Sequence, residues 1–146
     1  MTNATEVADL GSEIASDLPF LRRYARALTG SQSTGDTYAL AALEAIVADP
    51  ATVTGRSSTK VALFATFHGI WSSSGAPVPE ADVDGDFLEA QAQWRLRGLA
   101  ANTREALLLN VIEGFSFAEV GEIMNLSSDE AMHLVESAVS DMANLV

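Results

Sequence analysis

Cysteine is absent from the 146-residue sequence, and histidine occurs only twice. The lack of cysteine excludes disulfides, a thiolate nucleophile and zinc bound by thiolates. The two histidines, His68 and His133, are far apart in the chain. His133 and Glu136 form an i, i+3 pair, but two ligands do not make a metal site. We therefore expect no bound metal.

Motifs of catalysis and of cofactor binding are missing as well. The sequence has no glycine-rich phosphate loop and no nucleophile elbow. Asp82, Asp84 and Asp86 begin like a calcium-binding loop. The loop then fails, because Phe87 stands where glycine is needed and Gln93 where glutamate is needed. These absences predict a protein that is not an enzyme and that uses no cofactor.

Long apolar runs are also lacking. The longest run, residues 38–48, is about eleven residues long and includes Glu44, whereas a membrane span needs about twenty. Residues 1–10 have neither the basic start nor the apolar stretch of a signal peptide. With 48% hydrophobic residues, the chain can still bury a core in one domain or in two small lobes. We expect a soluble, cytoplasmic protein with no membrane partner.

Basic residues are scarce in the second half of the chain. The whole chain carries a net charge of −12, and residues 74–146 hold three basic against thirteen acidic side chains. DNA phosphates would be repelled by this half, because affinity for nucleic acid comes chiefly from Lys and Arg. A basic partner would be attracted instead.

The apolar pattern predicts an all-α protein, since no segment alternates like a strand. Spacings of three and four residues, interrupted by glycine, proline and short polar residues, predict seven helices. The first is expected to begin at Asp17 as the N-cap, with Pro19 in its first turn. The predicted helices cover about residues 17–29, 34–48, 58–71, 86–98, 103–113, 117–124 and 128–144.

A stretch rich in Ser, Gly and Pro separates the third and fourth predicted helices and indicates two lobes. The predicted division is a disordered N-terminus, a first lobe, a linker and a second lobe, at residues 1–11, 12–71, 72–85 and 86–146.

Capping boxes punctuate the second lobe. In such a box a short polar side chain binds a backbone N–H of the first turn, and a glutamate three residues later binds back. Three candidate pairs follow one another: Asn102 with Glu105, Ser116 with Glu119, and Ser127 with Glu130. A short helix, a tight turn and a longer helix then form a helix-turn-helix pattern.

The order of these features resembles extracytoplasmic-function sigma factors. Residues 21–30, Leu-Arg-Arg-Tyr-Ala-Arg-Ala-Leu-Thr-Gly, are similar to the first conserved helix of that family. Residues 103–124 are similar to its promoter-reading domain, and the whole resemblance covers residues 12–144. It implies two helical lobes resembling sigma regions 2 and 4, the second with a helix-turn-helix-type core.

The DNA-contacting charges of that family are missing. Its last helix usually carries Lys and Arg, whereas residues 128–144 contain none and include four carboxylates. Where basic residues usually stand, the sequence has Met132, Leu134, Ser137 and Val139. The third helix ends in residues 68–74, His-Gly-Ile-Trp-Ser-Ser-Ser, in place of an Arg- and Asp-rich stretch that helps to open DNA. We therefore expect no DNA binding.

Several segments resemble the sigma-factor-like domain of the PhyR family of response regulators more than a true sigma factor. They are Gly35-Asp36-x-Tyr38, Leu43-Glu44-Ala45, Val61-Ala62-Leu63-Phe64, Phe67-His68-x-Ile70-Trp71 and Glu113-Gly114-Phe115. The resemblance implies an anti-anti-sigma factor of the alphaproteobacterial general stress response. Such a mimic captures a small anti-sigma protein, NepR, and so releases the sigma factor.

Members of this family continue into a receiver domain that bears the phosphorylated aspartate of two-component signalling. This chain ends at Val146, where that domain would begin. We expect it to be the N-terminal part of a longer protein rather than a natural stand-alone protein. Its own receiver domain is then a second partner.

Candidate partner-binding residues lie on the last helix, where Ala131, Val135, Ala138 and Met142 form the expected inner stripe. Apolar residues outside that stripe and one carboxylate are the candidates there: Met132, Leu134, Val139 and Glu136. Weaker candidates in the first lobe are Tyr38, Phe67 and Trp71, for which core packing is the competing interpretation.

Two other functions stay open at this point. The first is an active sigma factor that binds polymerase and promoter DNA, against which the charge of the second half argues. The second is an all-helical domain that binds or converts a small molecule, for which the sequence offers no motif.

Overall fold

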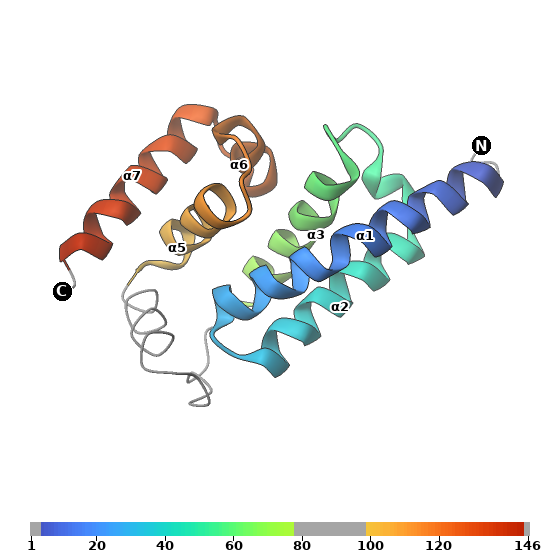
Figure 1. Ribbon diagram of the computed structural model, residues 1–146, viewed down its shortest axis with the longest axis horizontal. Coiled ribbons are helices and arrows are strands. Elements are labelled where there is room, and N and C mark those ends of the chain that lie inside the picture. Colours follow the sequence, from blue (N-terminus) through green and yellow to red (C-terminus); the bar gives the residue numbers. More distant parts are fainter. Residues whose placement is uncertain (1–3, 78–98, 145–146) are drawn as a thin grey trace.

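The computed structural model describes residues 4–77 and 99–144, and every regular element in these ranges is helical (Figure 1). The predicted all-α fold is thereby confirmed. None of the described helices combines the length and apolar character that a membrane span requires. The described helices are α1 (Ala4–Thr29), α2 (Gln32–Ala48), α3 (Thr59–Ser73), α5 (Ala101–Leu107), α6 (Phe117–Met124) and α7 (Ser128–Asn144).

Two short turns accompany these helices. A 3₁₀ turn, η1 (Pro50–Val53), follows α2, and a π-helical turn, η2 (Leu108–Ile112), continues α5. α3 extends to Ser73, two residues into the predicted linker. Linker residues 78–85 and the helix predicted over 86–98 lie outside the described residues.

Helix α1 begins at Ala4, far earlier than predicted. The expectation of disorder over residues 1–11 is wrong for residues 4–11, and Pro19 lies inside the helix instead of in its first turn. A proline within a helix removes one backbone donor, a cost that tertiary packing has to offset. Ile14 is buried, and the Thr59 hydroxyl at the start of α3 donates to the Glu13 carboxylate.

The first lobe consists of α1, α2 and α3 packed around aromatic side chains. The centroid of the Tyr24 ring of α1 lies 5.2 Å from that of the Phe64 ring and 5.5 Å from that of the Phe67 ring, both on α3. α2 approaches α1 closely at Gly35, where a Cβ would lie 2.7 Å from the backbone nitrogen of Arg26. Glycine is therefore needed at this crossing, because any larger residue would push the helices apart.

The second lobe contains the predicted helix-turn-helix. Ser116 and Glu119 exchange both hydrogen bonds of a capping box at the start of α6. Ser127 and Glu130 do the same at the start of α7. Asn125 ends α6 with a φ of 60°, the left-handed conformation typical of a helix C-terminus.

The capping box predicted for Asn102 and Glu105 does not form. α5 begins at Ala101, and no side chain caps it. Asn102 accepts from the neighbouring Thr103 N–H, at 2.9 Å. Glu105 is buried and faces the first lobe, so a tertiary contact has taken the carboxylate that the local pattern assigned to a cap.

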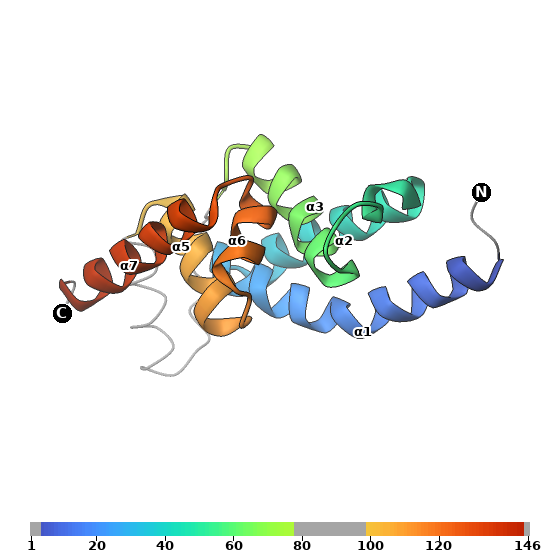
Figure 2. The same ribbon diagram turned by 90° about the horizontal axis from the view of Figure 1, so that it is seen from above.

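The two lobes share one hydrophobic core. α3 packs against α6 (Figures 1 and 2). The Phe64 and Phe115 rings meet edge to face, with centroids 5.1 Å apart. At the rim, the Ser57 hydroxyl donates to the Glu122 carboxylate at 2.8 Å. α7 and the start of α1 lie at opposite ends of the molecule in both views.

Candidate protein-binding surfaces

Helix α7 packs against the core through a narrow stripe of apolar side chains. Ala131, Val135 and Ala138 are buried, and Met142 packs partly buried against the same cluster, so the predicted inner stripe is confirmed. Small residues at two of these positions let α7 lie close to α5. The rest of the helix surface is left for solvent or a partner.

The predicted anchors on α7 do not share one face. Successive residues of an α-helix are about 100° apart, so Met132 and Val139 lie on one flank of the inner stripe and Leu134 on the other. Val139 is 53% exposed, whereas Leu134 is partly buried against the core. Glu136 lies on the Met132–Val139 side and is solvent-exposed. The structure therefore brings together Met132, Val139 and Glu136, which we call the α7 flank.

The electrostatics of α7 are uniformly acidic. Its four carboxylates, Asp129, Glu130, Glu136 and Asp141, are all exposed, and residues 128–144 include no Lys or Arg. Glu136 lies 3.9 Å from the ring nitrogen of His133, and both side chains are well exposed. Such a surface repels phosphate and attracts a cationic partner.

Two of the first-lobe candidates are core residues. Phe67 and Trp71 are fully buried, and the Trp71 indole N–H donates to the Pro77 carbonyl at 3.2 Å. The reason is the position of α3, which is covered by α1 and α2 and also by α6. We therefore drop both residues as surface anchors. Tyr38 is partly buried and packs against the core from α2.

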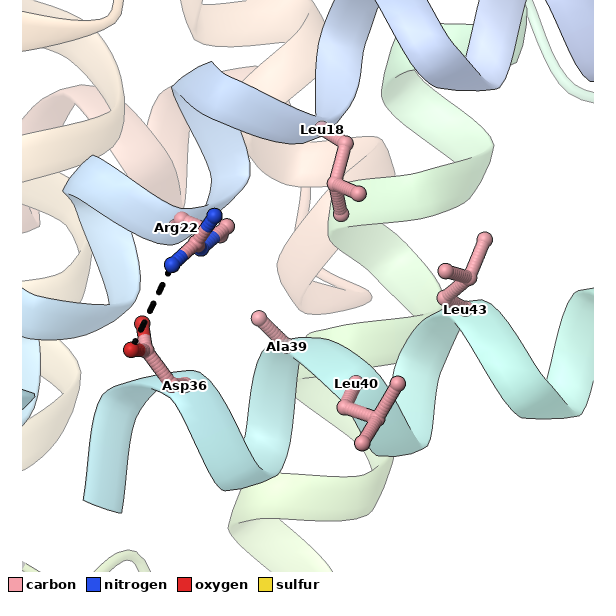
Figure 3. A pocket seen from close by; sticks show the side chains of 6 residues that line it. All are labelled: Leu18, Arg22, Asp36, Ala39, Leu40 and Leu43. Atoms are coloured by element: carbon pink, nitrogen blue, oxygen red, sulfur yellow. Dashed lines mark ion pairs between the residues drawn. The ribbon is translucent and has the colours of Figure 1, made fainter. Parts of the chain in front are cut away.

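An apolar groove between α1 and α2 was missed by the sequence reasoning (Figure 3). Its volume is about 250 Å³, and Leu18 of α1 faces Ala39, Leu40 and Leu43 of α2 across it. We call these four residues, with Arg22 and Asp36 at one end, the α1–α2 groove. Leu40 is 54% exposed, and Val47 continues the same side of α2 with 68% exposure. Apolar residues on nearly every face of the predicted second helix were the signal that could have revealed it.

The arginine cluster of α1 is paired with carboxylates. Arg26 donates two hydrogen bonds to Asp36, at 2.8 and 2.9 Å, and Arg22 lies 3.5 Å from the same carboxylate. Hydrogen bonds from Arg26, supported by Arg22, hold the pKa of Asp36 below its ordinary value. Arg23 donates to Glu113 of the second lobe at 2.9 and 3.3 Å. These arginines order the lobe and its junction, and Arg22 also lies at one end of the α1–α2 groove.

Known proteins match both lobes. A family model described as the Sigma2 domain of PhyR matches residues 14–68, and one described as the sigma-like domain of the response regulator PhyR matches residues 96–144. The phyllosphere-induced regulator PhyR of Methylorubrum extorquens is 38% identical over 130 residues, covering 89% of this chain and 48% of that protein. The chain thus spans about half the length of this curated relative.

Two solved structures share the fold. The NMR structure of the PhyRSL–NepR complex from Sphingomonas sp. Fr1 matches with a TM-score of 0.77 and 39% identity, over 92% of this chain and 87% of that chain. The sigma factor RpoE of Bartonella quintana, crystallised with the anti-sigma factor NepR, matches with a TM-score of 0.79 over 94% of this chain and 96% of that chain. RpoE is only 20% identical, so this likeness shows the fold alone.

Proposed function

Because the chain belongs to the PhyR family, whose two sigma-like models together match more than half of it, we propose that it is a sigma-factor mimic. In this proposal it binds a small anti-sigma protein of the NepR type and thereby releases the general-stress sigma factor. It acts in the cytoplasm, where sigma factors meet RNA polymerase. In a longer protein, a C-terminal receiver domain is its second partner.

One observation carries the proposal: the likeness to the Sphingomonas chain that was solved with NepR bound, at 39% identity over nearly the full length of both chains. The acidic α7 adds a physical reason. A helix-turn-helix whose second helix has four carboxylates and no cation keeps a sigma-like shape without affinity for DNA.

The two surfaces described above suit an elongated partner. The α1–α2 groove belongs to the first lobe and the α7 flank to the second, and α2 and α7 lie on opposite sides of the molecule (Figure 1). An amphipathic helix in an apolar groove gains its affinity from a few anchors along one face. The carboxylates of α7 favour a basic segment and speed its encounter.

An active sigma factor is the alternative function, and no observation in the described part of the chain favours it. Titration of the chain against promoter duplexes at low salt separates the two proposals. A mimic shows no binding, whereas micromolar affinity that falls steeply with salt would establish the alternative.

Calorimetry with the NepR-type protein of the same organism tests the main proposal. We expect the 146-residue chain to bind it with one-to-one stoichiometry. A chain that is folded by circular dichroism and gives no heat of binding would overturn the proposal.

Matched variants then locate the interface. We expect Val139→Ala and Leu40→Ala each to weaken binding by about 5- to 150-fold, the usual range for a buried anchor. Ser140→Ala, at an exposed position beside Val139, should leave the affinity unchanged. Leu134→Ala should lower stability more than affinity, because Leu134 packs against the core.

A further inference from the structure

A buried carboxylate joins the two lobes at their junction. Glu105 of α5 is 1% exposed, and it accepts a 2.9 Å hydrogen bond from the Tyr24 hydroxyl of α1. The His68 ring nitrogen Nδ1 of α3 lies 2.8 and 2.9 Å from the two oxygens of the same carboxylate. Two elements of the first lobe thus meet one side chain of the second.

Other charged groups on the elements that meet at this junction have contacts of their own. Arg104, the neighbour of Glu105, donates to the carbonyl oxygens of Leu28 at 3.4 Å and of Leu99 at 2.9 Å. Glu113, beyond η2, is bound by Arg23 of α1. On α3, the Lys60 ammonium lies over the ring of Phe115, 5.2 Å from its centroid. On α6, Glu122 accepts from Ser57.

His68 is the member of this centre that can change its charge near neutral pH. Its side chain is 21% exposed, so protons have access to the ring from solvent. The hydrogen bond to Glu105 raises the pKa of His68 against the opposing effect of burial. Burial and the same carboxylate raise the pKa of Tyr24 well above its ordinary value, so its hydroxyl stays a donor.

Loss of the proton on His68 changes what the junction holds. With His68 protonated, the desolvated carboxylate of Glu105 faces a cation and a hydroxyl donor. With His68 neutral, the charge of Glu105 keeps no opposite charge within this triad. A buried charge that loses its partner is strongly destabilising, whereas separation of the lobes returns the carboxylate to water.

We propose that Tyr24, His68 and Glu105 form a pH-sensitive latch between the two lobes. The latch is closed when His68 is protonated and opens more readily as His68 loses its proton. The pH dependence has this direction because the pKa of His68 is raised in the folded chain. The stabilisation of the junction by His68 is fully present below 6.5, the ordinary pKa of histidine, and is lost as pH rises through the raised pKa. The latch acts on the placement of the lobes and does not depend on partner binding.

The absence of native cysteine makes a direct test simple. Spin labels on Ala48→Cys of α2 and Ser140→Cys of α7, both exposed positions, report the distance between the lobes by pulsed electron paramagnetic resonance. We expect a narrow distance distribution at about pH 5.5 and an added longer component at about pH 8.5. The same distribution at both pH values would overturn the latch.

Variants identify the responsible group. His68→Gln should abolish the pH dependence of the distance distribution. His133→Gln removes the other histidine, which lies exposed on α7, and should leave the pH dependence intact. If pH dependence persists in His68→Gln or disappears in His133→Gln, the assignment to His68 is wrong.

A second measurement covers a variant that is too unstable to label. Hydrogen exchange of the α5 amides in the unlabelled parent, corrected for intrinsic exchange, should become faster as pH rises, while the α2 amides keep their protection. Equal pH responses of the two helices would overturn the proposal without any substitution.

Discussion

The Tyr24 hydroxyl donates a 2.9 Å hydrogen bond to the Glu105 carboxylate across 81 residues of sequence. Both residues are buried, one on α1 and the other on α5. A buried carboxylate that loses a donor retains the cost of its desolvation, so this bond matters more than a surface bond of equal length. The junction of the lobes is therefore a specific polar contact set within an apolar core.

Tyr24→Phe should lower the free energy of unfolding by about 1–3 kcal/mol, because it leaves Glu105 short of one donor. The ring contacts to Phe64 and Phe67 are kept in this variant. Urea unfolding followed by circular dichroism measures the change. Tyr38→Phe is the matched control and should stay within about 0.5 kcal/mol of the parent. A Tyr24→Phe variant as stable as the parent would contradict the importance of the bond.

Trp71→Ala should be among the most destabilising single substitutions, at about 3–5 kcal/mol, because it opens a large cavity in the shared core. Thermal and urea unfolding measure the loss. Val47→Ala, at a 68% exposed position, is the control and should change stability by less than about 0.5 kcal/mol. If Trp71→Ala were as stable as the parent, the indole would have to lie on the surface.

Local signals predicted the starts of α6 and α7 well. The Ser116–Glu119 and Ser127–Glu130 boxes form as expected, because each uses only backbone groups within one helical turn. The same local pattern failed at Glu105, because a hydroxyl and an imidazole of the first lobe bind its carboxylate in place of the helix cap. No sequence spacing reports a partner that lies 81 residues away.

For the same reason, the start of α1 was predicted wrongly and the α1–α2 groove was not predicted. Pro19 is a sound local signal for a helix start, but Ile14 packs on the lobe and extends the helix in front of it. The groove needs Leu18 of one helix and Leu40 of another, and neither residue is unusual in its own segment. Surfaces shared by two elements become visible only when both are placed.

Gly35→Ala should destabilise the first lobe, since the new Cβ would lie 2.7 Å from backbone of α1. Gly69→Ala in α3 is the matched control, because the Cβ that it adds would meet no neighbouring side chain or helix within 4 Å. We expect this control to gain about 0.5–1 kcal/mol, the usual benefit of alanine over glycine inside a helix. Unfolding in urea gives both values, and equal effects of the two substitutions would contradict the close helix crossing.

The Arg26–Asp36 pair should make stability fall in acid. The pKa of Asp36 is lowered in the folded chain. Its contribution to the free energy of unfolding is therefore present above the ordinary pKa of 3.8 and is lost as pH falls through the lowered pKa. Asp36→Asn should therefore be less stable than the parent at neutral pH, and the gap should close in acid. Urea midpoints at about pH 7, 4 and 3 measure the gap. Glu44→Gln, on the exposed side of α2, should show no such convergence.

Reversal of one charge on the α7 flank should slow partner association rather than speed dissociation. Glu136 is exposed and lies 3.9 Å from the His133 ring nitrogen, so Glu136→Lys should fold normally. Rim charges act mainly on the encounter rate, and we expect association with a basic NepR-type partner to slow by about two- to tenfold at low salt. The difference should shrink as salt shortens the Debye length to about 8 Å near physiological ionic strength. Asp9→Lys makes the same charge change near the start of α1 and should leave the rate nearly unchanged, because that end of α1 lies across the molecule from α7 (Figure 1). Stopped-flow measurements of both variants across a salt series decide the matter, and equal slowing by the two substitutions would show that net charge, and not the α7 flank, guides the partner.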